Sequence, residues 1–300
     1  MQRLGGPIHL LVNPAAGGGR AGHSIDRAYA ALRTVGPVEL VESTCAGDER
    51  RLAAEAHQAR ARALVVLGGD GSLSHAARGL IAARSATPLC VFAAGTGNDF
   101  AKSLGVPAHN FLAMARRLEA GTVRSIDAGE IDGVTFINAA GFGFDVDVLQ
   151  RMREPRRRPL LRGTPRYVVT ALQQLFRYSG LHATVPVLRD GASSHWLTVV
   201  FANGQWFGGA FHIAPAAHVS DGTLDLVGIA DASPLTRAGL FARALRGKHL
   251  SHRAVHTQRG TAFVITFVEP PHFQADGELH QASGPSVSVR CLPQALRVVG

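Results

Sequence analysis

The chain has 300 residues, of which 46% are hydrophobic, and it carries 31 Lys and Arg against 22 Asp and Glu. This length allows one large domain or two medium ones with a sizeable buried core. The formal net charge of +9 suits anionic membranes, nucleic acid or phosphorylated ligands, and does not choose between them. The widely spaced Cys45, Cys90 and Cys291 have neither metal nor disulfide spacing, which predicts a reducing, cytoplasmic location.

The first half of the chain alternates short apolar runs with amphipathic segments. Four runs are predicted to be strands and three segments to be helices: strands over 8–12, 38–42, 63–67 and 89–92, and helices over 23–35, 48–62 and 72–83. This alternation predicts right-handed βαβ units and a parallel sheet. No run is long enough for a signal sequence or a membrane span, so we expect the protein to meet lipid from the water side.

Polar or glycine residues follow each of the four predicted strands. They are Asn13, Thr44, the segment Gly68–Ser72 and the segment Gly95–Asp99. Ligands of parallel sheets bind beyond the carboxyl ends of the strands, where these residues converge. At 68–72, glycines allow a phosphate to approach the backbone, and the N–H groups at a helix start point towards it. The pattern predicts a nucleotide site, with an ordinary tight βα turn as the alternative.

A second glycine-rich segment, Gly17–Gly22, fits the pattern G-x-G-x-x-G, and Glu42 lies twenty residues further on. This is the fingerprint of dinucleotide binding, but a single match is weak. Asn13 and Pro14 also put several extra residues between the strand and the glycines. The sequence favours a flexible glycine loop that covers a nucleotide over a classical NAD site.

From about Thr122 the pattern changes to alternating β-strands. Segments 123–131 and 134–139 form a predicted hairpin about Asp132-Gly133. Further strands are predicted over 183–188, 197–202, 223–229, 262–267, 273–275 and 287–290, and helices over 145–153, 165–178 and 234–246. We therefore expect an α/β nucleotide-binding domain over 1–126 and a mostly antiparallel β-sandwich domain with helical insertions over 127–300, with the nucleotide site in the cleft between them.

A basic cluster lies between the first two helices of the second half. It runs from Arg151 to Arg166 and contains Arg151, Arg153, Arg156, Arg157, Arg158, Arg162 and Arg166 against the single acid Glu154. It fits a solvated basic loop or a patch that docks on an anionic membrane. Nucleic acid is not expected as a partner, because the cluster lacks interleaved aromatic residues. The fourteen histidines show no metal motif, and no G-x-S-x-G elbow suggests a serine hydrolase.

Three motifs taken together carry a family resemblance. They are GGDGS at 68–72, GTGNDFAKSLG at 95–105 and DGE at 276–278, read together with Asn13-Pro14. The chain resembles the diacylglycerol kinase catalytic family, in particular its soluble bacterial lipid kinases, which are related to sphingosine kinases. The family usually has Pro-Leu where Ala93-Ala94 stands and Thr where Ser72 stands. The resemblance implies an ATP-dependent and Mg²⁺-dependent kinase for a hydroxyl of diacylglycerol or a related lipid.

Residue roles are carried over position by position. In the family the glutamate of DGE is the proposed general base, which here is Glu278 with Asp276 beside it. The expected nucleotide-binding residues are Asn13, Thr44, Gly68, Gly69, Asp70, Gly71, Ser72, Thr96, Asn98 and Asp99, with Asp70 able to hold Mg²⁺ or the nucleotide. The family also carries a structural Mg²⁺ on an Asp-Gly loop, which here would use the Asp221 carboxylate and the carbonyls of His218 and Thr223. A plain β-turn is the alternative for that loop.

Two other functions stay open at this point. An NAD kinase also uses GGDG, although its usual Asn-Glu motif is missing here. A non-catalytic regulatory protein responding to a nucleotide or lipid is the other, although the intact Asp70, Asp276 and Glu278 argue against it. The sequence leaves a homodimer open and predicts a peripheral position at the inner face of the membrane. It does not identify the lipid pocket, for which Phe142, Phe144, Phe176, Trp206, Phe207 and Phe211 are candidates.

Overall fold

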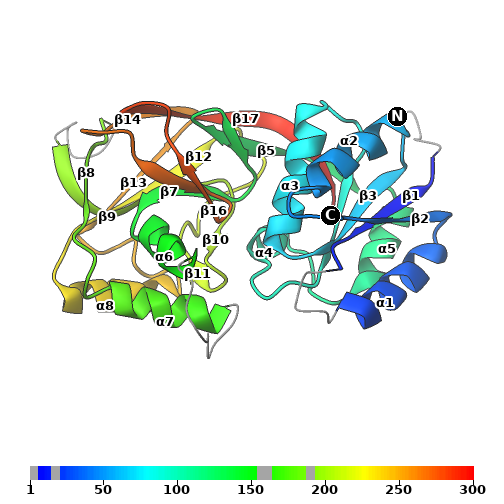
Figure 1. Ribbon diagram of the computed structural model, residues 1–300, viewed down its shortest axis with the longest axis horizontal. Helices are drawn as coiled ribbons and strands as arrows, with labels where there is room; N and C mark the ends of the chain where they lie inside the picture. The colour runs from blue at the N-terminus through cyan, green and yellow to red at the C-terminus, as the bar shows by residue number, and fades with distance from the viewer. Residues whose placement is uncertain (1–5, 15–20, 154–163, 187–192) are drawn as a thin grey trace. The chain divides into compact units, whose positions relative to one another are not determined.

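The computed structural model describes residues 6–14, 21–153, 164–186 and 193–300 (Figure 1). By its internal contacts the chain forms two compact units. The first contains Met1–Asp127 together with Pro293–Gly300, and the second contains Ala128–Leu292. The last eight residues thus belong with the N-terminal unit. The expected nucleotide site between two domains stays a prediction.

The first unit is built on a parallel sheet with the strand order β17-β4-β3-β1-β2. Its strands are β1 (Ile8–Val12), β2 (Val38–Glu42), β3 (Ala63–Gly68), β4 (Leu89–Ala93) and the C-terminal end of β17 (Ser286–Val299). Every residue of β1, β3 and β4 is buried, as expected for strands that are covered on both faces. The predicted parallel sheet is confirmed.

The described part of this unit contains the helices α1 (Ala21–Arg33), α2 (Glu49–Gln58), α3 (Asp70–Ala82), α4 (Asp99–Ser103) and α5 (Phe111–Glu119). Two of them, α2 and α3, pack closely, because a Cβ on Gly79 of α3 would clash with the carbonyl of Arg50 on α2. On α5, Phe111 stacks on Phe92 of β4 with a centroid separation of 5.0 Å. These contacts hold α2 against α3 and α5 against β4.

The second unit is mostly antiparallel β-structure. Its strands are the remainder of β5 (Val123–Ile131), β6 (Val134–Phe136), β7 (Ala139–Gly143), β8 (Leu181–Thr184), β9 (Ser193–Ala202), β10 (Trp206–Phe207), β11 (Phe211–His212), β12 (Leu224–Ala230), β13 (Val255–Gly260), β14 (Ala262–Thr266), β15 (His272–Ala275), β16 (Glu278–Gln281) and the first part of β17. The pairs of β9 with β7, β8 and β12 are all antiparallel. The predicted antiparallel β-rich domain is confirmed.

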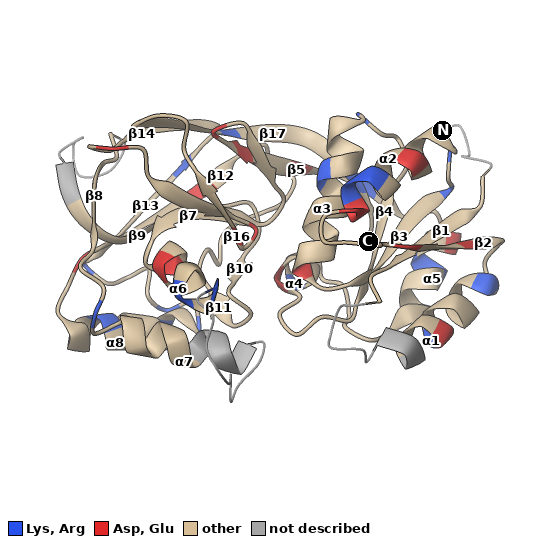
Figure 2. Cartoon of the chain, viewed as in Figure 1, with Lys and Arg blue, Asp and Glu red and all other residues tan. Residues whose placement is uncertain are grey.

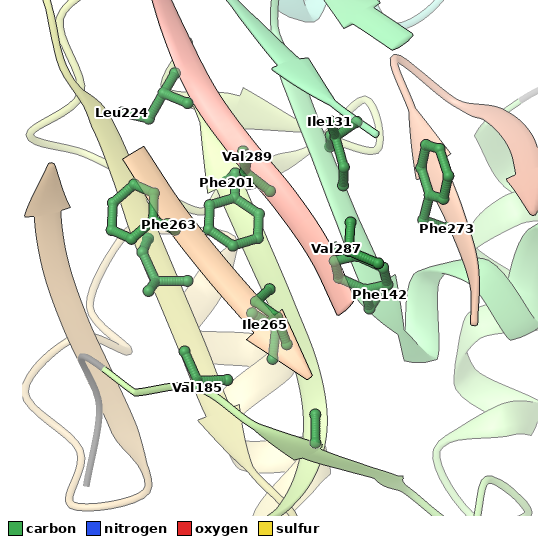
Figure 3. Packing of buried hydrophobic residues seen from close by; sticks show 14 of the residues in the cluster. Ile131, Phe142, Val185, Phe201, Leu224, Phe263, Ile265, Phe273, Val287 and Val289 are labelled. Carbon is green, nitrogen blue, oxygen red and sulfur yellow. The ribbon is translucent and has the colours of Figure 1, made fainter. Parts of the chain in front are cut away.

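The core of this unit lies between strands that alternate inward and outward (Figure 3). On β14, Phe263 and Ile265 are buried while their neighbours are exposed, and β17 alternates in the same way through Val287 and Val289. Full burial of each such side chain contributes about 1.5–3 kcal/mol. A second apolar cluster involves the helices α6 (Phe144–Arg153), α7 (Thr164–Gln174) and α8 (Pro234–Ala244).

Several elements differ from the sequence prediction. The strand expected over 134–139 is broken, because β6 ends at Phe136 and β7 starts at Ala139. The helices α4 and α5 and the strands β13 and β16 were not predicted, and β17 extends to Val299 rather than ending near Arg290. Within the described residues, no helix has the length and apolar character needed to cross a bilayer. Residues 17–20 of the glycine-rich segment and Arg156, Arg157, Arg158 and Arg162 of the basic cluster lie outside the described residues.

Candidate active site

The carboxyl edge of the sheet in the first unit gathers the predicted nucleotide residues. Strands β1, β3 and β4 run parallel and in register, so the segments after them share one edge. Asn13 follows β1, the segment Gly68–Ser72 joins β3 to α3, and Ala94–Asn98 joins β4 to α4. The convergence expected from the strand ends is therefore present in the structure.

The two glycine loops of this edge contact each other through their backbones. A Cβ on Gly95 would lie 2.5 Å from the Cα of Gly69, and a Cβ on Gly69 would lie 3.2 Å from the Cα of Gly95. Both positions need glycine for this close approach rather than for a ligand alone. Gly71 differs, since a Cβ there would meet nothing within 4 Å. Gly71 is therefore the glycine of this segment that faces open space.

The first turn of α3 lies at the same place and has no side-chain cap. Its N-cap is Gly69, which has no side chain to accept a hydrogen bond from the helix. The first N–H groups of a helix have no partner within the helix, and together with the helix dipole they attract anions. The exposed Gly71 and the half-buried Ser72 lie in this turn. This turn fits a phosphate group.

Asp70 of GGDGS and Asn98 of GTGNDFAKSLG also hold the two glycine loops in place. Asp70 Oδ1 accepts a hydrogen bond of 3.2 Å from the backbone N–H of Phe100, which ties the start of α3 to α4. Asn98 is buried in the left-handed conformation, with φ 52°. Its amide bonds the N–H and the carbonyl of Gly95 at 2.9 and 2.8 Å. The side chain of Asn98 thus shapes the loop that carries Thr96.

Glu49 connects two of the predicted residues and was missed by sequence reasoning. Its side chain is buried at the start of α2, and Oε1 accepts hydrogen bonds of 3.0 Å from both Asn13 and Ser72. The other oxygen, Oε2, makes no hydrogen bond within the described residues. In the sequence Glu49 is one acid among several at the start of a charged helix. The folded arrangement of α2 against α3 and β1 brings it between Asn13 and Ser72.

The remaining residues of this edge have local partners. The backbone N–H and the hydroxyl of Thr44 both donate to Asp48 Oδ2 at 3.0 Å. The hydrogen bond from Arg51 and those from Thr44 lower the pKa of Asp48 to about 2. Asp99 is buried and pairs with Lys102 at 3.1 Å, whereas Thr96 is exposed. Thr44 and Thr96 are thus both exposed at this edge, and of the two it is Thr44 whose hydroxyl donates to a neighbouring acid.

In the second unit, Asp276 anchors the DGE turn. Asp276 has a φ of 50°, and its carboxylate accepts hydrogen bonds from the backbone N–H groups of Ile137, Asn138 and Ala139 at 2.9, 2.9 and 3.2 Å. This explains the break between β6 and β7, because these donors turn towards a side chain instead of a neighbouring strand. The backbone N–H of Asp276 also donates a hydrogen bond of 2.9 Å to the carbonyl of Ala139.

Glu278 begins β16 directly after this turn and is half-buried. It is paired with Ala275 across the hairpin. Gln274, whose side chain is fully buried, accepts a hydrogen bond of 2.9 Å from the N–H of Gly277. Asp276 and Gln274 therefore hold the turn that directly precedes Glu278.

An apolar pocket lies in the same unit and encloses about 570 Å³, its open mouth included. Its lining comes mostly from α6, α8, β9, β12 and the turn after α7, and includes Phe144, Leu175, Leu197, Phe211, Ile213, Leu240 and Phe241. Of the six aromatic candidates for a lipid pocket, Phe144, Phe207 and Phe211 line it. Phe142 instead packs in the β core against Phe267 and Phe273, and Phe176 is exposed.

Asp145 is the buried acid of this pocket. Its Oδ1 accepts a hydrogen bond of 3.1 Å from the hydroxyl of Thr198, while Oδ2 makes none of normal geometry within the described residues. Burial raises the pKa of Asp145 to about 6, against the lowering effect of the nearby Thr198 and Gln274 side chains. A carboxylate held this way is an acceptor for a polar group of a ligand that is otherwise apolar.

The loop expected to hold a structural Mg²⁺ gives Asp221 different partners. Asp221 Oδ1 accepts from the N–H and the hydroxyl of Thr223 at 3.0 and 2.7 Å. Oδ2 accepts from the guanidinium of Arg259 at 2.6 Å. Within the described residues, no three His, Cys, Asp or Glu side chains cluster in a way that could hold a metal. Asp221 is thus paired with Arg259 in this structure, and the Mg²⁺ site, which would also use the carbonyls of His218 and Thr223, stays a prediction.

Comparisons with known proteins agree with the motifs. Residues 7–131 match the family model of the diacylglycerol kinase catalytic domain. Residues 138–300 match that of the YegS C-terminal NAD kinase beta sandwich-like domain. The chain belongs to the diacylglycerol kinase catalytic family. The resemblance read from GGDGS, GTGNDFAKSLG and DGE is confirmed.

Individual relatives cover the chain to different extents. A protein named diacylglycerol kinase from Mycobacterium tuberculosis (strain ATCC 25618 / H37Rv) is 33% identical over 313 residues, which take in 98% of this chain and 95% of the relative. A protein named "Probable lipid kinase YegS-like" from Pseudomonas savastanoi pv. phaseolicola is 37% identical over 185 residues, which are 60% of this chain and just 58% of the relative. A crystal structure described as a diacylglycerol kinase from Bacillus anthracis str. Sterne has a TM-score of 0.74 over 98% of this chain and 96% of that chain, at 19% identity. That structure shows the shared fold.

Proposed function

We propose that the protein is a lipid kinase that transfers the γ-phosphoryl group of ATP to a hydroxyl of diacylglycerol or a related lipid, with Mg²⁺. The observation that carries the proposal is the open first turn of α3. There Gly71 faces open space, and the N-cap glycine has no side chain that could take the place of a phosphate at the helix start. Membership of the diacylglycerol kinase catalytic family and the apolar pocket of the second unit support the same assignment.

In this proposal the first unit binds the nucleotide. The N–H groups of Gly71 and Ser72 donate to phosphate oxygens, and the exposed hydroxyl of Thr96 is a further donor. Bound Mg²⁺ would neutralise charge on the phosphates, and Asp70 is the carboxylate of this edge that would hold it. Glu49 keeps Asn13 and Ser72 in place through its two hydrogen bonds.

The second unit binds the lipid and activates its hydroxyl. The apolar lining of the pocket suits an acyl chain, and Asp145 would accept a hydrogen bond from a polar group of the lipid. Glu278 accepts the proton of the attacking hydroxyl as the lipid oxygen bonds to phosphorus and ADP leaves. Asp276 and Gln274 position Glu278 by holding the turn in front of it.

Transfer of radiolabelled phosphate from ATP tests the proposal directly. The purified chain is incubated with ATP, with and without Mg²⁺, against a panel of diacylglycerols, other hydroxylated lipids and NAD. We expect labelled lipid that depends on Mg²⁺, and no labelled NADP. Labelling of NAD would instead make the protein an NAD kinase. ATP binding without transfer to any acceptor would favour a regulatory protein.

The location is proposed together with the activity. A kinase of membrane lipids must work at a bilayer surface, and we propose a cytoplasmic protein bound peripherally at the inner face of the membrane. Cell fractionation in low and high salt tests this, since electrostatic attachment weakens as salt rises. The possibility of a homodimer stays a prediction.

A further inference from the structure

Two helices of the second unit expose large apolar side chains to solvent. On α7, Val169 and Leu172 are 40% and 44% exposed, and Phe176 in the turn that follows is 63% exposed. At the start of α8, Leu235 is 83% exposed. An apolar cluster of this kind on one face of a protein usually marks a binding surface.

The four side chains belong to neighbouring parts of the fold. The guanidinium of Arg237, one turn into α8, donates to the carbonyls of Leu175 and Tyr178 at 2.9 and 2.7 Å. Arg237 also pairs with Asp231 just before α8. These bonds join the turn after α7 to the first turn of α8 (Figure 1), and Phe176 and Leu235 belong to the two segments that they join. We call Val169, Leu172, Phe176 and Leu235, with the exposed cations Arg243 of α8 and Arg246 just after it, the α7–α8 outer face.

The two segments that carry this face contain cations and no acids. Although the chain contains 22 Asp and Glu, the segments 164–186 and 232–254 contain none. Figure 2 shows basic but no acidic residues along α8. Arg177, Arg243, Arg246 and Lys248 are exposed cations of the same segments. A face with apolar side chains among cations, and without acids, complements the surface of an anionic bilayer.

Other residues of α8 and of the turn after α7 line the apolar pocket. Leu175 follows α7, and Leu240, Phe241 and Ala244 come from α8. A lipid that leaves a bilayer for this pocket would travel the shortest path if the bilayer lay against these helices. A second copy of the chain is a poorer occupant, because in a two-fold dimer the basic face would meet itself.

We propose that the α7–α8 outer face docks the protein on anionic lipid bilayers, with Phe176 and Leu235 entering the interface and the arginines binding lipid headgroups. The proposal rests on the proposed lipid kinase function, which explains why the protein would bind a bilayer. Its test does not, because vesicle binding is measured without ATP or turnover. A chain that docks through this face but phosphorylates no lipid would therefore disprove the kinase and keep the docking surface.

The first experiment places a fluorescent reporter at matched sites. Leu235→Trp and Phe176→Trp are compared with Val268→Trp, since Val268 is 86% exposed but does not belong to α7 or α8. Vesicles of phosphatidylcholine alone are compared with vesicles that contain about 30% phosphatidylglycerol. We expect a blue shift in emission, and quenching by brominated acyl chains, for Leu235→Trp and Phe176→Trp on anionic vesicles. An equal response from Val268→Trp, or no response at either site on α7 and α8, would overturn the proposal.

The second experiment removes the apolar contacts. In Phe176→Asp/Leu235→Asp, two exposed side chains become charged, and we expect co-sedimentation with anionic vesicles to weaken about tenfold or more. Val268→Asp should bind as the parent does, and melting temperatures confirm that each variant is folded. Should the double variant fail to fold, Phe176→Ser and Leu235→Ser singly give the same comparison. Sedimentation without vesicles measures the oligomeric state of the parent and of the double variant. If the parent is a dimer and the double variant a monomer, the face is a self-association surface, which contradicts docking.

Discussion

The glycine edge of the first unit and the DGE turn of the second are built in different ways. At the glycine edge, backbone meets backbone at Gly69 and Gly95, and the open donors belong to the first turn of α3. At the DGE turn, the side chains of Asp276 and Gln274 bind backbone donors. The first kind of site is changed by adding atoms, and the second by removing an acceptor. Predictions for the two units therefore differ in what each substitution does to ligand binding, turnover and stability.

The largest effect is expected at Glu278. Glu278→Gln keeps the size and the hydrogen bonding of the side chain but cannot take a proton. General-base catalysis typically contributes about 10²–10⁴-fold, so kcat for the preferred lipid should fall by about that factor. ATP affinity and melting temperature should hardly change, as measured by calorimetry. Turnover close to that of the parent would place the base at another residue.

Asp276→Asn serves as the contrasting control for that variant. The amide would point an N–H₂ group at one of the backbone donors of residues 137–139, which then loses its acceptor. Turnover and melting temperature should both fall, unlike in Glu278→Gln, where turnover alone falls. If Asp276→Asn leaves the melting temperature unchanged, these hydrogen bonds do not hold the turn.

A pH-dependent effect on stability is expected at Asp145. Folding raises its pKa from 3.8 to about 6, which corresponds to roughly 3 kcal/mol. Because the folded protein holds this proton more tightly than the unfolded chain, Asp145 destabilises the fold as pH rises from about 4 to about 6, and fully above that. Asp145→Asn should therefore raise the free energy of unfolding at about pH 8 and change it little at about pH 4. Urea unfolding at both pH values measures this, and an equal change at both would mean that ionisation of Asp145 is not responsible.

The glycines separate ligand contact from loop packing. Gly71→Val places its side chain in open space, so the fold should survive while ATP affinity falls about tenfold or more. Gly69→Val meets the backbone of Gly95, so it should also lower stability, by about 1–3 kcal/mol. Calorimetry with ATP and thermal unfolding of both variants provide the comparison. Unchanged ATP binding in a folded Gly71→Val protein would remove α3 as the phosphate site.

The smallest effect is expected at Arg259. Arg259 and Asp221 form an exposed pair, and such pairs contribute little, so Arg259→Gln should shift the melting temperature by only about 2 °C or less. In the parent, Arg259 occupies Asp221 Oδ2, and millimolar Mg²⁺ should not alter the melting temperature in the absence of nucleotide. In Arg259→Gln the Asp221 carboxylate is no longer paired with Arg259, and millimolar Mg²⁺ should raise the melting temperature. A rise in the parent equal to that in the variant would show that Mg²⁺ binds at the loop despite Arg259.

Much of the architecture could be predicted from local pattern. The buried runs at 8–12, 63–67 and 89–92, each followed by a polar or glycine loop, indicated the parallel sheet and its ligand edge, because strand periodicity and turn chemistry are local properties. The three motifs identified the family for the same reason. The hairpin about Asp132-Gly133 was found, whereas the break at Ile137 and Asn138 was not. That break depends on Asp276, which is 138 residues away from Asn138 in the chain.

Tertiary structure decided the partners of the motif residues. The sequence alone could mark Asp70, Asn98 and Asp276 as polar residues of the site, and the fold shows that each also binds a backbone group of a loop. Glu49 between Asn13 and Ser72, and Arg259 on Asp221, were invisible beforehand, because neither pair is close in the chain. The acidic pocket residue Asp145 became notable only through its burial. Which groups share a small volume depends on strand register and helix packing, and these are settled by long-range contacts that no single segment of sequence contains.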